Sequence, residues 1–205
     1  MDAVAAAGDH DGVQTPEEFE VRPFASPAEF EAWLEAEHER APGVYVKLAK
    51  KAAGIPSITA AEAVEVALCF GWIDGRGNRV DDDWFTVRYT PRRAKSVWSQ
   101  KNVETVARLT AQGRMRPAGL AAVRAAQDDG RWDRAYAGPA TITVPDDLAA
   151  ALAADPAAAA AFEALDRTNR YSVLWRVHTA ATPQTRATRV AAAVQMLAEG
   201  RRSHD

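Results

Sequence analysis

One segment of the chain concentrates side chains that could bind an anion. It runs from Pro91 to Asn102 and combines four cations with two hydroxyl groups, two amides and an indole, around the start of a predicted helix. Free N–H groups and the positive dipole end of a helix N-terminus favour a carboxylate or a phosphate. Arginine adds bidentate hydrogen bonds, and tryptophan adds a flat apolar wall. The candidate ligand-binding residues of this segment are Arg92, Arg93, Lys95, Ser96, Trp98, Ser99 and Asn102.

The same segment also has a purely structural interpretation. Ser99 is a good N-cap for the helix that follows, Trp98 could belong to the core, and the arginines could pair with carboxylates. A cap accounts for Ser99 but does not account for three neighbouring bases. Both interpretations therefore stay open at the level of the sequence.

A second pair of candidate ligand-binding residues is Trp72 and Asp74. They lie two apart on a predicted strand and so share one face of it. A carboxylate beside an indole could accept a hydrogen bond from a ligand, act as a general base, or neutralise Arg92, and the ion pair is the simplest of these. We expect a hairpin to bring this pair next to the basic segment, so that the two form one pocket.

Three isolated residues complete the set. His38 and Asp74 are the catalytic acid/base candidates if the protein is an enzyme, although a histidine bonded to a helix end is the simpler interpretation of His38. Arg186 lies on the same face of the last predicted helix as its apolar residues, so its charge needs a carboxylate, carbonyl groups or a bound anion as partner. An ion pair with a carboxylate is the favoured alternative, and a bound anion would make Arg186 a ligand-binding residue. Cys69 has no histidine near it in sequence and fits a packed thiol better than a nucleophile.

Longer strings in the chain carry a resemblance to a known family. The strings are ALCFGWIDG from residue 67, PRRAKSVWSQKN from 91, GRMRPAGL from 113, DGRW from 129 and TRATR from 185. They resemble the YdeI/OmpD-associated family, also called bacteriocin-protection proteins, and the resemblance covers about residues 22–201. It implies a link to tolerance of bacteriocins or antimicrobial peptides, with no reaction established. The chain departs from the family pattern in having Ala180-Ala181 and Gln184, where relatives usually have Ala-Lys and Glu.

Local patterns predict the elements that must position these residues. Capping signals and apolar spacing indicate helices over 27–40, 60–70, 99–113 and 117–129, and strands over 44–50, 72–80 and 84–90. A Gly-rich turn near 75–78 and an acidic corner at Asp81-Asp82-Asp83 suggest that the last two strands pair. Val103, Val106, Ala107 and Thr110 form the expected apolar face of the third helix. After a linker at 137–143, Ala-rich helices are expected over 145–154, 156–165, 167–180 and 183–199.

These elements predict the α+β class. We expect a small mixed body of short strands with packed helices over residues 21–137, and a helical C-terminal subdomain over 144–201. Residues 1–20 carry six acids and no lysine or arginine, so we expect a disordered acidic leader rather than a signal peptide.

Composition limits the classes of function. The chain has 205 residues, 47% of them apolar and 26% charged, with no apolar run long enough to span a membrane. One cysteine and four scattered histidines give no disulfide and no metal-ligand spacing, so we expect no metal, no cofactor and a cytoplasmic protein. Residues 86–134 hold eleven bases against four acids, which favours an anionic partner.

Three hypotheses follow for the function. The first is binding of a small anionic or aromatic molecule, in the service of antibiotic or antimicrobial-peptide tolerance. The second is an enzyme that acts on such a molecule in the same pocket. The third, nucleic-acid binding, is disfavoured by the net charge of −3 and by the lack of a recognition motif. The oligomeric state stays open.

Deleting residues 1–18 should leave folding intact, because this stretch has few sizeable apolar side chains with which to pack. The melting temperature of the shortened chain should stay within about 1–2 °C of the full chain, since loss of an unpacked segment removes no core contacts. A drop of many degrees in a thermal melt would show that the leader packs on the body.

Overall fold

The computed structural model describes residues 19–203, so the expected leader lies almost wholly outside the described residues. The chain divides into two compact units. The first unit contains residues up to 67 together with 72–91, and the second contains residues 68–71 together with 92–203. Within these residues no helix combines the length and apolarity needed to cross a membrane. The domain boundary expected between 137 and 144 stays a prediction.

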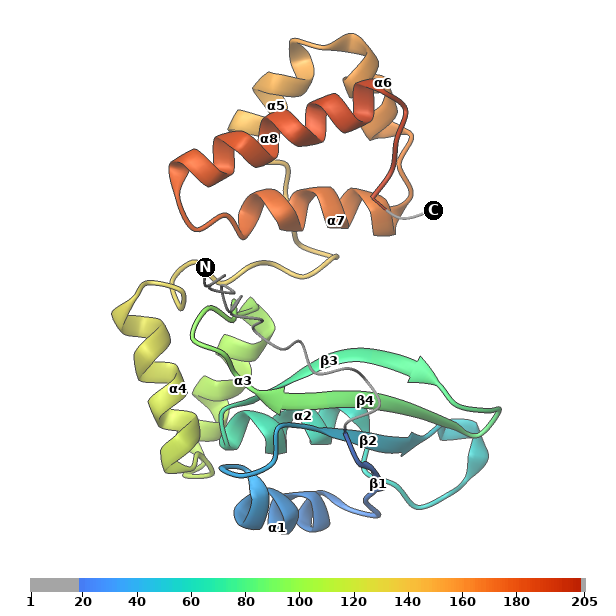
Figure 1. The fold of residues 1–205 in the computed structure, drawn as a ribbon, viewed down its shortest axis with the longest axis vertical. Coiled ribbons are helices and arrows are strands. Elements are labelled where there is room, and N and C mark those ends of the chain that lie inside the picture. The colour runs from blue at the N-terminus through green and yellow to red at the C-terminus, as the bar shows by residue number, and fades with distance from the viewer. Residues whose placement is uncertain (1–18, 204–205) are drawn as a thin grey trace, which may run out of the picture. The chain divides into compact units, whose positions relative to one another are not determined.

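A four-stranded sheet forms the centre of the first unit. Its order is β1-β2-β4-β3, with β1 parallel to β2 and the other neighbours antiparallel, and β3 and β4 form the long hairpin in Figure 1. The strands are β1 (Val21–Pro23), β2 (Val44–Ala49), β3 (Trp72–Arg79) and β4 (Trp84–Pro91). The short parallel strand β1 is absent from the sequence prediction, because three residues give no readable alternation.

Two helices begin where the capping signals place them. In α1 (Pro27–Glu37) the Ser26 hydroxyl accepts a hydrogen bond from the Glu29 N–H at 3.4 Å. In α2 (Ala60–Cys69) the Thr59 hydroxyl and the Glu62 carboxylate bond to each other's backbone N–H groups. These bonds lower the pKa of Glu62. A single-turn 3-10 helix, η2 (Lys51–Ala53), follows β2.

The core of the first unit is aromatic. Phe30 of α1 meets the edge of Tyr89 of β4 with ring centroids 5.6 Å apart, and Trp33 meets the edge of Trp72 of β3 at 5.8 Å. Burial raises the pKa of Tyr89 well above its ordinary value, with a smaller contribution from the charge of Asp74. The amphipathic spacing of α1 is thus satisfied by one face of the sheet.

The hairpin turn does not lie where the glycines suggested. Residues 75–78 are part of β3, and the irregular step in strand register lies between Asp74 and Gly77. The chain reverses at the expected acidic corner, where the Asp81 carboxylate accepts the N–H groups of Asp83 and Trp84 at 2.8 Å each. These bonds lower the pKa of Asp81. The expected turn near 75–78 is therefore wrong, because glycine here serves a bulge rather than a reversal.

The second unit is helical. It contains α3 (Gln100–Ala111), α4 (Pro117–Asp128), α5 (Asp146–Ala153), α6 (Pro156–Glu163), α7 (Arg167–His178) and α8 (Pro183–Ala198), and Figure 1 shows α5 to α8 gathered as one group. Their shared core includes Leu148, Phe162, Val177, Val190 and Leu197. In α3 the buried residues are Val106 and Leu109, so the expected face with Ala107 and Thr110 is wrong. A sheet plus helices within the described residues confirms the α+β class.

Gly119 in α4 lies against the backbone of residues 68–69. A Cβ atom placed on Gly119 would lie 2.2 Å from the Cys69 carbonyl oxygen, and the Arg116 N–H donates to that same oxygen at 3.0 Å. Cys69 is itself buried, as expected for a packed thiol. Only a residue without a side chain permits this approach.

Gly119→Ala should therefore destabilise the protein, although alanine is the better helix former by about 0.5–1 kcal/mol. We expect a net loss of about 1–3 kcal/mol in the free energy of unfolding, as for an overpacked core. Chemical denaturation measures this loss, and Ala121→Gly at an exposed position of the same helix calibrates the propensity contribution. A gain in stability for Gly119→Ala would contradict the close contact.

Candidate functional site

Trp72 lies in the core of the first unit. Its side chain is 1% exposed, and its indole N–H donates to the His38 carbonyl oxygen at 3.3 Å. The indole ring and the indole N–H of Trp72, which the sequence assigned to a ligand, thus contact other parts of the protein instead. The His38 ring forms a 2.8 Å hydrogen bond through Nδ1 with the Leu34 carbonyl, which is the helix-end arrangement expected from the sequence.

Asp74 is exposed on β3, opposite Tyr89 of β4 in the strand register. It belongs to the first unit, whereas Arg92 and Arg93 belong to the second. The pocket expected between Asp74 and the basic segment therefore stays a prediction.

Arg92 and Trp98 stack on each other in the second unit. The Arg92 guanidinium carbon lies 3.5 Å from the centroid of the Trp98 ring, and Nη1 donates to the Val97 carbonyl at 3.3 Å. Trp98 is 1% exposed and meets the edge of Trp132 at 4.9 Å. This cation–π stack places Trp98 in the core, where the structural interpretation had it.

The hydroxyl groups of the basic segment also form local bonds. Ser99 caps α3 by accepting the Asn102 N–H at 3.1 Å, and the Ser96 hydroxyl accepts the Arg93 N–H at 3.0 Å. These bonds shape the loop before α3. They leave Lys95 at the exposed tip of the turn.

Lys95 and Ser96 line a cavity of about 630 Å³ in the second unit. The other walls come from the turn at 129–134 and from residues 175–189, at the end of α7 and the start of α8. Three segments far apart in the sequence thus meet around one cavity. Each contains part of a string singled out above, namely the basic segment, the DGRW string and the TRATR string. We call this space the cationic cavity.

Arg131 fixes the first two walls to each other. Its Nε donates to the Asp129 carboxylate at 2.7 Å, and its Nη1 donates to the Ser96 carbonyl at 2.8 Å. The Arg131 side chain is only 14% exposed. Its hydrogen bonds lower the pKa of Asp129, so this carboxylate is charged and paired at neutral pH.

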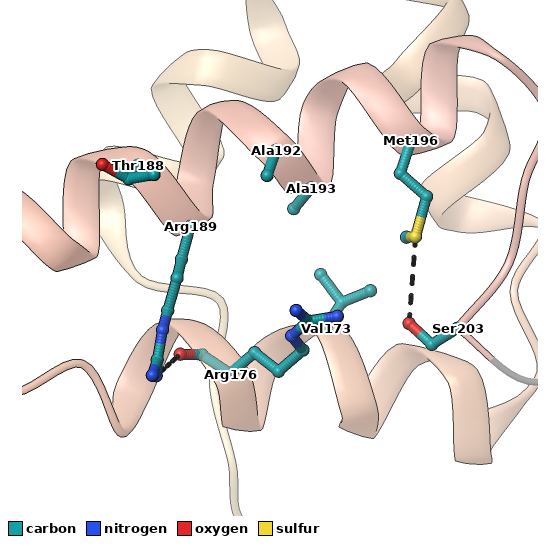
Figure 2. A pocket seen from close by; sticks show the side chains of 8 residues that line it. All are labelled: Val173, Arg176, Thr188, Arg189, Ala192, Ala193, Met196 and Ser203. Carbon is teal, nitrogen blue, oxygen red and sulfur yellow. Dashed lines mark hydrogen bonds between the residues drawn. The ribbon is translucent and has the colours of Figure 1, made fainter. Parts of the chain in front are cut away.

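Two more arginines tie the third wall into place through backbone carbonyls. Arg134 donates from Nη1 to the Ala181 carbonyl at 3.0 Å and from Nη2 to the Asp129 carbonyl at 3.4 Å. Arg189 of α8 donates from Nη1 to the Arg176 carbonyl of α7 at 2.6 Å and to the Thr179 hydroxyl at 3.2 Å, as Figure 2 shows for the Arg176 bond. Because these acceptors carry no charge, they do not neutralise the positive charges of Arg134 and Arg189.

Trp175 and His178 supply the remaining chemistry of the cationic cavity. Trp175 meets the edge of Tyr136 with ring centroids 5.9 Å apart, and the His178 Nε2 lies 2.9 Å from the Thr143 carbonyl oxygen. Neither residue was among the sequence candidates. Their spacing of three residues on one predicted helix was the available signal, because it places both on one face.

Arg186 has a carboxylate partner rather than a free charge. It bonds to both oxygens of Asp147 in α5, from Nε at 2.6 Å and from Nη2 at 2.8 Å. The pair raises the pKa of Arg186 and lowers that of Asp147. This is the ion pair that the sequence favoured for Arg186, and it joins α8 to α5.

Breaking this pair should weaken the protein only modestly, because both side chains are a third or more exposed and water screens their charges. We expect Asp147→Asn to cost about 0.5–1 kcal/mol at pH 7. The native pKa of Asp147 is depressed below 3.8, so its contribution is full above that value and is lost as the pH falls through the depressed value.

Thermal melts of wild type and Asp147→Asn should therefore differ at pH 7 and converge at an acidic pH below the depressed pKa of Asp147. The matched control is Asp146→Asn, which removes a neighbouring charge from the same first turn of α5. An equal difference at both pH values would show that Asp147 does not act through its charge.

No group of three metal-ligating side chains occurs among residues 19–203.

Two family models match the chain. Residues 22–122 match a Domain of unknown function (DUF8412), and residues 141–200 match the model described as Bacteriocin-protection, YdeI or OmpD-Associated. No curated protein and no solved structure matches the chain. The second match contains α5 to α8 and the TRATR string, so the resemblance seen in the sequence is confirmed over that range. Over residues 141–200 the chain is therefore similar to the bacteriocin-protection, YdeI or OmpD-associated family.

Proposed function

We propose that this protein binds a small organic anion with a flat apolar part in the cationic cavity. The observation that carries the proposal is the convergence of Lys95, Arg131, Arg134 and Arg189 from three distant segments on one cavity. Four like charges around one cavity repel one another, and this repulsion destabilises the folded protein. An anionic ligand removes that repulsion.

The balance of charge supports an anion. Four cations line the cavity against one carboxylate, Asp129, which Arg131 already neutralises. Arg134 and Arg189 bond to neutral acceptors, and a guanidinium carries five N–H donors, more than those bonds use. Lys95 adds an exposed ammonium group with three donors.

The size and the apolar lining support an organic ligand over a bare inorganic ion. The volume of about 630 Å³ lies in the range of small-molecule sites. Trp175 gives a flat surface on which a ring can stack, and Val97 and Ala180 add apolar contact. The expected ligand is therefore an aromatic phosphate, whose charge of about −1.5 to −2 can use more than one of the four cations.

The biological role that we propose is tolerance of bacteriocins or antibiotics by sequestration of such an anion. It rests on the family to which residues 141–200 are similar and on binding without chemical change. An enzyme in the same cavity is the competing function, with His178 as its acid/base group. Mass spectrometry of a ligand recovered after incubation distinguishes the two, because only an enzyme returns it altered.

The proposal predicts the effect of a single charge. Phenyl phosphate should bind saturably to the full chain, and Lys95→Gln should weaken that binding about tenfold, as for loss of one charged hydrogen bond. Lys95 is exposed, so the melting temperature should not change. Lys101→Gln removes an equally exposed charge from α3, away from the cavity lining, and is the matched control.

Isothermal titration calorimetry at fixed salt measures these affinities. Equal affinities of Lys95→Gln and Lys101→Gln would contradict the cationic cavity as the site, as would the absence of saturable binding. Tight binding of duplex DNA with a steep salt dependence would instead favour the nucleic-acid hypothesis.

A further inference from the structure

A second, smaller cavity lies between α7 and α8, beside residue 203 (Figure 2). Its volume is about 200 Å³. Val173 of α7 and Ala192, Ala193 and Met196 of α8 give it an apolar lining. The Ser203 hydroxyl lies 4.0 Å from the Met196 sulfur and closes one side. We call this space the apolar cavity.

Two consecutive alanines produce the space. Ala192 and Ala193 carry only a methyl group each, where larger side chains on α8 would reach towards Val173 on α7. The neighbouring residues Val190 and Leu197 are buried in the core shared by α5 to α8, so the helix is held in place on either side of the gap. The cavity is thus a gap in side-chain packing between two fixed helices.

Arg176 brings a charge to this apolar space. Figure 2 shows its side chain running along α7, with the guanidinium group beside Val173. Arg189 also lines the cavity, but its Nη1 is bonded to α7 through the Arg176 carbonyl and the Thr179 hydroxyl. For the Arg176 guanidinium, the structure over residues 19–203 gives no hydrogen bond or ion pair. Of the two arginines that line this cavity, Arg176 is therefore the one whose guanidinium is not held by another group among these residues.

We propose that the apolar cavity is a second binding site, which takes a small organic monoanion with a compact apolar body, such as an aromatic or short-chain carboxylate. An engineered apolar cavity of about 150 Å³ holds benzene, so about 200 Å³ accommodates a ring with one carboxylate at its mouth. A single available guanidinium matches a single carboxylate in bidentate geometry.

This ligand class differs from that of the proposed function. The cationic cavity is about three times larger and carries four cations, which suits a larger or more highly charged anion. The second site therefore stands on observations independent of Lys95 and Arg131.

Benzoate is the probe for this site, and benzyl alcohol is its neutral counterpart of similar size. Calorimetric titration of the full chain should show saturable binding of benzoate and at least about tenfold weaker binding of benzyl alcohol. Arg176→Gln should weaken benzoate binding by a similar factor. Arg167→Gln, at an exposed position of the same helix outside the cavity lining, should leave it unchanged.

Ala192→Phe places a ring in the lining of the cavity and should abolish benzoate binding, whereas Ala191→Phe adds the same ring at an equally exposed neighbouring position outside the lining and should not. The two sites are separated by Lys95→Gln, which should leave benzoate binding unchanged. Loss of benzoate binding in Lys95→Gln but not in Ala192→Phe would overturn the second site and leave the proposed function standing. Absence of saturable benzoate binding, or equal binding by all variants, would overturn it as well. Retained benzoate binding together with failure of phenyl phosphate to bind would support the second site and contradict the proposed function.

Discussion

The bonds from Arg131 hold together the walls on which the cationic cavity depends. This guanidinium joins the Asp129 carboxylate to the Ser96 carbonyl, and so fixes a turn and a loop that lie 35 residues apart in sequence. Arg134 and Arg189 extend the same device to the end of α7 and the start of α8. The ring contact between Trp98 and Trp132 and the hydrogen bond from the Tyr136 N–H to the Trp98 carbonyl hold the C-terminal end of the same loop.

The choice of acceptor decides what such an arginine does. Arg186 bonds to the carboxylate of Asp147, so its charge is neutralised and its role is to join two helices. Arg134 and Arg189 bond to carbonyl groups, which orient the guanidinium and leave its positive charge for a neighbour. An arginine therefore joins two helices in one place and provides a positive charge to the cationic cavity in the other.

Sequence reasoning succeeded where the signal was local. Proline at the first helical position and a side-chain cap at Ser26, Asp155 or Thr182 mark helix starts without reference to the rest of the chain. The bulge at Gly75 to Gly77 and the burial of Leu109 depend on what the strand or helix packs against, so they were missed. The strand expected at β2 is present. Tyr45, however, is buried together with Val44 and Val46, because both faces of the sheet are covered at this point, which the sequence of the strand does not show.

The candidate site shows the same difference between local sequence signals and long-range packing. The basic segment and the TRATR string were recognisable from composition, and Lys95 and Ser96 do line the cationic cavity. Trp72 and Trp98 were expected as ligand walls, but the type of a residue does not reveal its burial, and both lie in the core. Trp175 meets Tyr136 across 39 residues of sequence, a contact that no local pattern contains.

The volume of the apolar cavity can change, through the residues at positions 192 and 193, without a change in the stability of the helix that carries them. Leucine and methionine have nearly the same helix propensity as alanine, so the helix itself sets no preference among these three residues at Ala192 or Ala193. The size of the side chain there is limited by whatever must fit between α7 and α8. The proposed second site therefore predicts that relatives with other ligands carry other side chains at these two positions on the same four-helix scaffold.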